Sequence, residues 1–141
     1  MTILQDLECY SHTRLGKCKV ILVSFSFHIV CLYRLSYRLN KLFFIGKILS
    51  IMVEYLMRIV FSAEISSKSK IDHSFMIVHG ENIIIGSDVS IGHHCKIYNG
   101  VTLGNKDILD PINKQPKIGN NVTICTGAKI LGDINIGDNA V

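Results

Sequence analysis

Aliphatic residues return every six positions through the second half of the chain. Three runs share this spacing: Ile65, Ile71, Ile77 and Ile83; Ile85, Ile91, Ile97 and Leu103; Ile118, Ile124, Ile130 and Ile136. The register slips by two between the first run and the second, and small or aliphatic residues often occupy the fifth place of each hexad. A period of six fits neither a helix nor an alternating strand, but it is the signature of a parallel β-helix that buries its core coil against coil. Ordinary strands of a sandwich would show irregular spacing.

The first part of the chain has a helical pattern. Leu32, Leu35 and Leu39 recur at helical spacing, with Arg34 and Arg38 on another face. We therefore predict a mainly β protein, with an N-terminal helical segment at 1–63 followed by a parallel β-helix domain at 64–141.

Two apolar stretches in the helical segment raise the question of a membrane. Residues 20–33 are too few to cross a bilayer comfortably. Residues 42–61 are enough, but Lys47, Glu54 and Arg58 interrupt them, and central charges are costly in lipid. Attachment of the N-terminal helices to a membrane surface is thus favoured over a span. Within this region 41–47 predicts a connection between helices, with Gly46 as the break.

Charge and cysteine content exclude some classes of protein. The net charge of +4 is too mild to indicate nucleic acid, and no signal peptide is recognisable at the start. The five cysteines are scattered without a CxxC pair, so neither a zinc knuckle nor a disulfide framework is indicated. Reduced thiols fit a cytoplasmic protein, which could lie at the inner face of the membrane.

One segment, 104–117, breaks the six-residue period. It contains two prolines and several polar residues, so we expect a loop that leaves the β-helix. Loops on rigid scaffolds often carry function, although a tolerated insertion is the alternative.

Short motifs add a family resemblance. The segments "FHIVCLYRLSYRL", "EISSKSKID", "HGENIIIG", "VTLG", "QPKIG" and "GAKILG" resemble, in order and nearly in spacing, the serine acetyltransferase family of left-handed β-helix acyltransferases. The resemblance runs from about Phe27 to the C-terminus. It implies a left-handed β-helix, a homotrimer with sites between subunits, and acetyl transfer from acetyl-CoA to a hydroxyl. The family normally continues beyond a position equivalent to Val141, which suggests a C-terminally short domain.

The resemblance also implies a catalytic pair. The family's catalytic histidine falls in the stretch that matches His79 to Gly86, where Asn82 replaces a glycine. The supporting acid lies fifteen residues earlier, at Glu64, where the family has an aspartate. A neutral imidazole can deprotonate an attacking alcohol, and a carboxylate can orient it and stabilise the imidazolium. The simpler alternative is that His79 is only a turn residue.

Other positions match the family's binding residues. Gly104 and the "CTGAK" turn, with Thr126, Gly127 and Lys129, lie where the family passes the pantetheine arm of CoA. We expect no metal: adjacent histidines such as His93 and His94 are usually solvated at a turn, and a hexapeptide carbonic anhydrase would need three well-spaced histidines.

The acceptor positions depart from the family. Lys114 and Gln115 replace an Arg-His pair that helps to bind the serine carboxylate, and aspartates are replaced by Val78 and Ser11. These changes favour a sugar hydroxyl, as in surface-polysaccharide biosynthesis, with L-serine as the alternative. A non-catalytic truncated scaffold is the alternative of another class.

Overall fold

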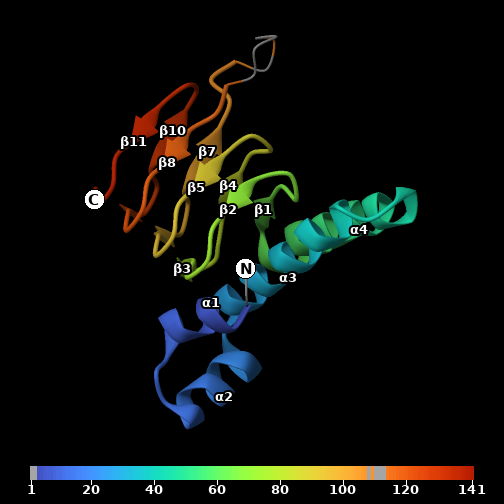
Figure 1. The fold of residues 1–141 in the computed structure, drawn as a ribbon, viewed down its shortest axis with the longest axis vertical. Helices are drawn as coiled ribbons and strands as arrows, with labels where there is room; N and C mark the ends of the chain where they lie inside the picture. The colour runs from blue at the N-terminus through green and yellow to red at the C-terminus, as the bar shows by residue number, and fades with distance from the viewer. Residues whose placement is uncertain (1–2, 108, 110–113) are drawn as a thin grey trace.

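The structure is a computed structural model, and it describes residues 3–107, 109 and 114–141. Over these residues helices come first and short strands follow (Figure 1). The helices are α1 (Ile3–Tyr10), α2 (Arg14–Val23), α3 (Phe25–Asn40) and α4 (Phe44–Phe61). The strands are β1 (Ala63–Ile65), β2 (Lys70–Ile71), β3 (Met76–Val78), β4 (Ile83–Ile85), β5 (Ser90–Ile91), β6 (Lys96–Tyr98), β7 (Thr102–Gly104), β8 (Lys117–Ile118), β9 (Thr123–Ile124), β10 (Lys129–Leu131) and β11 (Asn135–Ile136).

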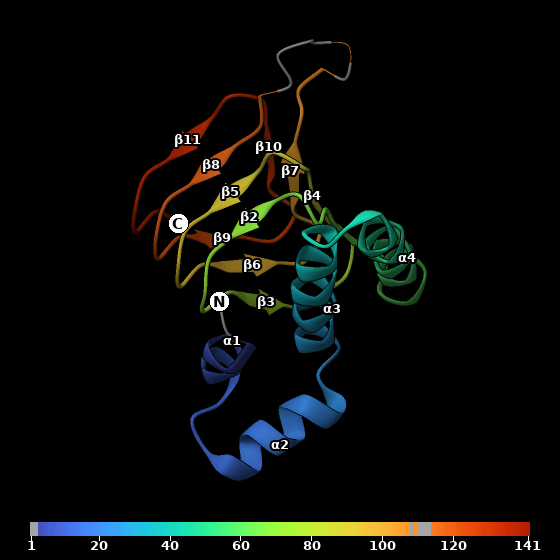
Figure 2. The ribbon, with the colours of Figure 1, turned by 45° about the vertical axis from the view of Figure 1, so that its right-hand side comes forward.

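The strands stack into three parallel sheets, as a coiled chain requires (Figures 1 and 2). We name them sheet A (β1-β4-β7-β10), sheet B (β2-β5-β8-β11) and sheet C (β3-β6-β9). Every strand pairing is parallel, and each of the first three coils contributes one strand to each sheet in turn, while the last contributes β10 and β11 to sheets A and B. The corners between the sheets therefore stack into three edges, named A–B, B–C and C–A. The predicted parallel β-helix is confirmed.

The six-residue period forms the core of the β-helix. Ten of the twelve hexad positions, from Ile65 to Ile124, are buried, and Ile130 and Ile136 are partly buried. Fifth-place residues such as Val89, Val101 and Val122 are buried beside them. Each aliphatic side chain removed from water in this way contributes about 1.5–3 kcal/mol, so the repeat itself stabilises the stack.

Coil length varies, and the variation falls at corners. Ala63 pairs with Ile83, twenty residues later, whereas Ile84 pairs with Thr102 after eighteen. The two extra residues of the first coil lie in the corner 79–82, which accounts for the slip of the hydrophobic register. Thr102 pairs with Lys129, twenty-seven residues on, because the segment 104–117 is inserted there. Part of that predicted loop, 108 and 110–113, lies outside the described residues.

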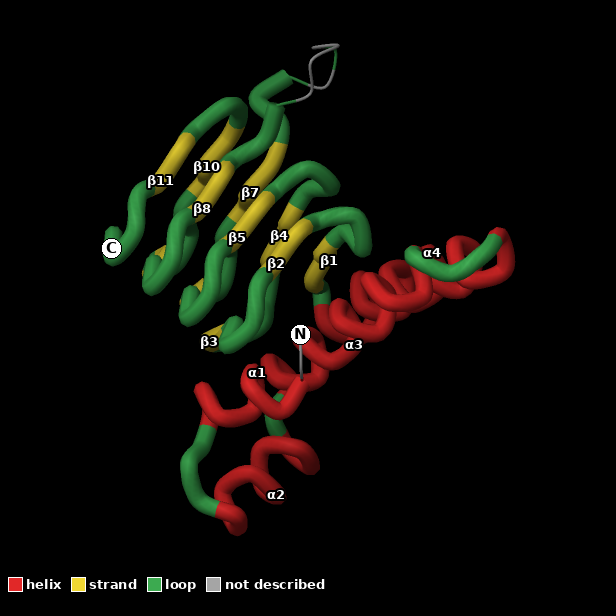
Figure 3. Tube along the Cα trace, viewed as in Figure 1, coloured by secondary structure: helices red, strands yellow, loops and turns green. Residues whose placement is uncertain are grey.

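The helices α3 and α4 form a hairpin whose tip points away from the β-helix (Figure 3). The predicted break at Gly46 is wrong, because α3 ends at Asn40 and α4 begins at Phe44. Gly46 is buried in the first turn of α4, where a Cβ would lie 2.5 Å from the carbonyl oxygen of Leu39. Glycine is therefore used here for close helix packing. By length and composition, no single described helix could cross a membrane, although the pair α2 and α3, bent by 78°, passes the same test jointly.

The buried face of α3 differs from the leucine stripe seen in the sequence. Leu35 is exposed, whereas Tyr33 and Arg34 are buried. The guanidinium of Arg34 donates to both carboxylate oxygens of Asp6, at 2.8 and 3.0 Å, and to the carbonyl oxygen of Ile71 at 2.6 Å. This buried charge is tolerated because it is paired and hydrogen-bonded. It joins α1 and α3 to the first coil.

Candidate active site

The lengthened corner 79–82 presents His79 on the surface. His79 and Asn82 both adopt left-handed backbone conformations, with φ of 56° and 53°. Such conformations cost a non-glycine residue roughly 1 kcal/mol, and asparagine tolerates them best. The corner is fixed by hydrogen bonds from the Glu81 amide to the His79 carbonyl, at 2.9 Å, and from the Asn82 amide to the Ser62 carbonyl, at 3.0 Å. The exposed imidazole is thus carried on a defined turn.

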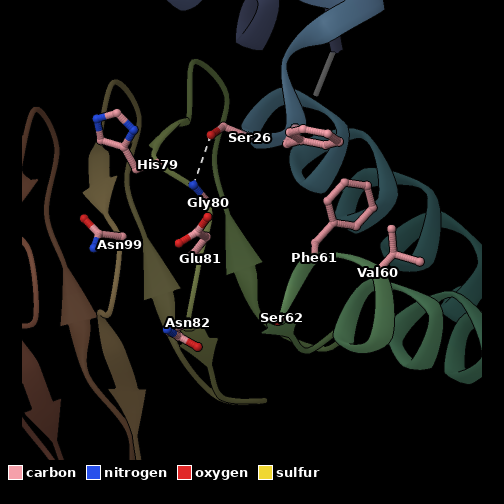
Figure 4. A pocket seen from close by; sticks show the side chains of 10 residues that line it. Ser26, Val60, Phe61, Ser62, His79, Gly80, Glu81, Asn82 and Asn99 are labelled. Atoms are coloured by element: carbon pink, nitrogen blue, oxygen red, sulfur yellow. Dashed lines mark hydrogen bonds between the residues drawn. The ribbon is translucent and has the colours of Figure 1, made fainter.

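Two helices hold this corner from outside the β-helix. The Gly80 amide donates to the Ser26 hydroxyl of α3 at 3.1 Å, and a Cβ on Gly80 would lie 2.4 Å from Ile29 (Figure 4). The Tyr10 hydroxyl of α1 donates to the Ile77 carbonyl at 3.1 Å and accepts from the Ile77 amide at 2.8 Å. Burial raises the pKa of Tyr10, so its phenol remains a neutral donor. Sequence reasoning missed Ser26 and Tyr10, because no periodic signal marks them.

The corner borders a pocket of about 720 Å³ between the helices and the β-helix. Figure 4 shows polar side chains from the corners, including His79 and Asn99, on one side, and Val60 and Phe61 of α4 on the other. A pocket with an apolar wall and a few convergent polar groups is the usual form of a small-molecule site.

Glu64 lies on the outer side of β1, in a neighbouring pocket that shares Ser62 and Asn82 with that of His79. Its carboxylate forms an ion pair with Arg58 of α4. Among the hydrogen bonds of the described residues, none joins Glu64 to His79. Both residues belong to the first coil, with Glu64 on its sheet A strand and His79 at its C–A corner. Their predicted pairing stays a prediction.

Stacking also brings Glu64 and Lys129 to one face of sheet A. Glu64 pairs in register with Ile84, Ile84 with Thr102, and Thr102 with Lys129, so the four form one row. The Lys129 ammonium donates to the Thr102 hydroxyl at 2.8 Å and to the Gly100 carbonyl at 2.6 Å. All four residues of the row line a pocket of about 430 Å³. The predicted carboxylate and the predicted cofactor lysine therefore share a surface.

Thr126 and Gly127 lie on the C–A edge, the same edge as His79. The Gly127 amide donates to the Asn99 carbonyl at 2.9 Å, and the Thr126 hydroxyl donates to the Asn99 side chain at 3.1 Å. Asn99 belongs to the corner between those of His79 and Thr126. A Cβ built on Gly127 or Gly104 would meet no described atom within 4 Å, so both positions leave space for a ligand. Gly104 itself lies at the start of the A–B edge.

The predicted acceptor residues lie on the A–B edge, apart from His79. The Lys114 ammonium pairs with Asp133 at 2.7 Å, and this hydrogen bond lowers the pKa of Asp133. Gln115 is buried, and its side-chain oxygen accepts the Asp88 amide at 3.1 Å. A single chain therefore does not bring Lys114 or Gln115 to the His79 corner.

Three histidines gather on the B–C edge. The ring of His73 stacks on that of His93 at 5.5 Å, and the Nδ1 atoms of His93 and His94 lie 2.9 Å apart. Within the described part of the chain, no group of three or more His, Cys, Asp or Glu side chains is arranged to hold a metal ion.

These features define a hexapeptide-repeat acyltransferase fold with a histidine corner beside a pocket, and known proteins of that fold match the chain. No family model matches. A serine acetyltransferase of Helicobacter pylori is 36% identical over 125 residues, which cover 87% of this chain and 70% of that protein. A serine acetyltransferase of Bacillus licheniformis is 33% identical over 124 residues, but they cover only 55% of its length. The chain belongs to the serine acetyltransferase family.

Solved structures agree with this assignment and give the hand of the coil. A serine acetyltransferase in complex with CoA superposes with a TM-score of 0.83 at 28% identity, and that of Neisseria gonorrhoeae in complex with serine gives 0.84 at 28% identity. Each alignment covers 97% of this chain and 56% of the solved one. The fold is the left-handed parallel β-helix that the resemblance implied, and the chain spans just over half the length of these structures.

Proposed function

We propose that this chain is an O-acetyltransferase that moves the acetyl group of acetyl-CoA to a hydroxyl of a small acceptor. The observation that carries the proposal is the exposed imidazole of His79, held on a left-handed corner beside a pocket in a member of this family. A histidine fixed by its backbone and open to ligand on its side chain suits a general base.

In the proposed reaction His79 takes the hydroxyl proton as the acceptor oxygen attacks the thioester carbonyl. The new carbon–oxygen bond forms, the carbon–sulfur bond breaks, and the proton passes from the imidazolium to the departing CoA thiolate. Glu64 is proposed to support the imidazolium as a carboxylate on the same coil, and its ion pair with Arg58 keeps it oriented.

The proposed path of CoA follows the open surface near His79. Thr126 and Gly127 share the C–A edge with His79, and Lys129 shares a row with Glu64. The space beside Gly104 and Gly127 supports their assignment to the pantetheine arm. The solved relative in complex with CoA supports acetyl-CoA as the co-substrate.

L-serine is the acceptor that the comparisons favour, because the relatives are named serine acetyltransferases and one solved relative is a complex with serine. They support this alternative better than the sugar hydroxyl expected from the substituted positions. A sugar hydroxyl remains a second candidate because of two contacts. Lys114 is paired with Asp133, and the side-chain oxygen of Gln115 accepts the Asp88 amide. Both contacts weaken the case for a serine carboxylate at these residues.

We also propose a homotrimer with the site between subunits. The A–B edge with Lys114 and the C–A edge with His79 are different edges of one prism, so a second subunit is needed to bring them together. Cyclic symmetry would supply the same contact three times. Light scattering tests this: a trimer is expected, and a monomer at micromolar concentration would exclude the shared site.

A competition experiment tests the acceptor. The purified chain is given acetyl-CoA with L-serine and a sugar or sugar-nucleotide at equal concentration, and the products are separated by mass. A predominance of O-acetylserine supports the family's usual substrate, whereas an acetylated sugar supports the second candidate. Absence of CoA release with every acceptor, in a thiol assay, would favour the scaffold alternative.

A further inference from the structure

The outer surface of the α3–α4 hairpin tip is apolar and exposed. We use "hairpin tip" for residues 41–52. Its apolar residues Leu42, Phe43, Phe44, Ile45, Ile48, Leu49, Ile51 and Met52 are all exposed, Phe43 by 96% and Phe44 by 73%. A contiguous apolar surface of this kind normally contacts something other than water.

The exposed apolar residues cover about half of the circumference of α4, and the buried and charged residues occupy the other half. Gly46, Ser50 and Met57 are the buried residues of α4, and Gly46 directly contacts α3. The Ser50 hydroxyl has no hydrogen-bond partner among the described residues. Small residues therefore face the neighbouring helix and large apolar residues face outward, which is the arrangement of helix pairs in lipid.

The charges of the hairpin tip are all positive. Lys41 and Lys47 flank the aromatic pair Phe43 and Phe44, and no Asp or Glu occurs from 38 to 53. Each cation near a membrane surface adds attraction to anionic headgroups. Long basic side chains beside a buried apolar helix can extend to the headgroups.

The other end of α4 is fixed to the β-helix. Glu54 accepts the Ser67 amide at 2.7 Å, and Arg58 pairs with Glu64. The tip lies at the opposite end of the hairpin, away from the coils (Figures 1 and 3). From Phe44 to Met52 the helix rises about 12 Å along its axis, well short of the roughly 30 Å of a bilayer's hydrocarbon core.

We propose that the hairpin tip inserts into the headgroup and upper acyl region of an anionic lipid bilayer. The β-helix and its His79 pocket then remain on the aqueous side, separated from the lipid by the second half of α4, which is about 13 Å long. This proposal does not depend on the acetyl-transfer reaction, since it rests on the exposure and charge of α4.

A single tryptophan tests the insertion directly, because the chain contains no tryptophan. Phe43→Trp is expected to shift its emission to the blue with vesicles of phosphatidylcholine and phosphatidylglycerol, and to be quenched by brominated acyl chains. Ile134→Trp, at an exposed position of the last coil, is the control and should not respond. No shift of Phe43→Trp, or equal shifts of both variants, would overturn the proposal.

Vesicle flotation gives the affinity. Phe43→Ser combined with Phe44→Ser should weaken binding to the anionic vesicles at least tenfold, and Leu131→Ser with Ile134→Ser should change it less than twofold. Lys41→Gln and Lys47→Gln should each weaken it about fivefold, and salt should act in the same direction. If the Phe43 and Phe44 changes leave flotation unaltered, lipid insertion is wrong. If they instead break an oligomer detected by light scattering without lipid, the surface contacts protein and not lipid.

Discussion

The hydroxyl of Ser26 accepts a hydrogen bond from the Gly80 amide, so the first turn of α3 holds the residue that follows His79. We predict that Ser26→Ala lowers kcat about fivefold and leaves the KM for acetyl-CoA unchanged, because one neutral hydrogen bond contributes about 1 kcal/mol. Steady-state kinetics measure this, and Ser26→Thr should restore turnover. A fall in melting temperature with normal kcat would instead mean that the bond serves only the fold.

His79→Ala should abolish most of the activity. Loss of a general base costs about 10²–10⁴-fold in rate. The matched control is His94→Ala, since His94 is also exposed at a corner and has the same φ of 56°. Thiol-release assays compare the two. Activity within about threefold of the wild type for His79→Ala would make His79 only a turn residue.

Glu64→Gln should reduce turnover and spare CoA binding, because the amide keeps the shape of the side chain but not its negative charge. Arg58→Gln tells whether a loss of turnover comes from the missing Glu64 carboxylate or only from the broken ion pair between Glu64 and Arg58. If Glu64 acts on the imidazolium, Arg58→Gln has the smaller effect on kcat. Unchanged kcat at neutral pH for Glu64→Gln removes the carboxylate from the mechanism.

Arg34→Met should destabilise the fold by roughly 3–5 kcal/mol, because Asp6 is then buried without its partner. Lys17→Met breaks an exposed pair with Glu8 and should cost less than about 1 kcal/mol. Urea unfolding followed by circular dichroism measures both. If the two variants have equal midpoints, the buried pair does not stabilise the protein.

Cysteine labelling can locate the cofactor. Cys18 and Cys125 are exposed, whereas burial raises the pKa of Cys95, so Cys95 stays protonated at neutral pH and reacts slowly. We expect acetyl-CoA to slow iodoacetamide labelling of Cys125, which precedes Thr126, and not of Cys18. Mass spectrometry of digested peptides gives both rates. Equal labelling of Cys125 with and without acetyl-CoA would exclude this corner from the CoA site.

The sequence predicted the β-helix because a six-residue period repeats the inward position at every strand. It did not predict the contacts of the helices. Ser26 and Gly80 are 54 residues apart, and Arg34 and Asp6 are 28 apart, and no period connects either pair. The leucine stripe does not mark the buried face of α3. Arg34, whose charge suggests exposure, is buried because it pairs with Asp6 on α1.

The predicted site residues show the same limit. The sequence gives the types of these residues and the spacing between them. Which residues lie beside them in the structure depends on the length of each coil. Glu64 and Lys129 share a row because coils of different length still stack in register. The ion pairs of Glu64 with Arg58 and of Lys114 with Asp133 could not be read from the repeat, since both cross between separate elements or coils.

Coil length distinguishes two kinds of segment, namely those that build the repeating coil and those that are added to it. An eighteen-residue coil is enough for the three sheets, and the His79 corner and the 104–117 segment are the two places where the coil exceeds it. Because both additions lie between strands, the inward positions on either side stay in register. Deleting or lengthening either addition should therefore leave the scaffold folded, so that new chemistry can be grafted onto this β-helix by exchanging its corners alone.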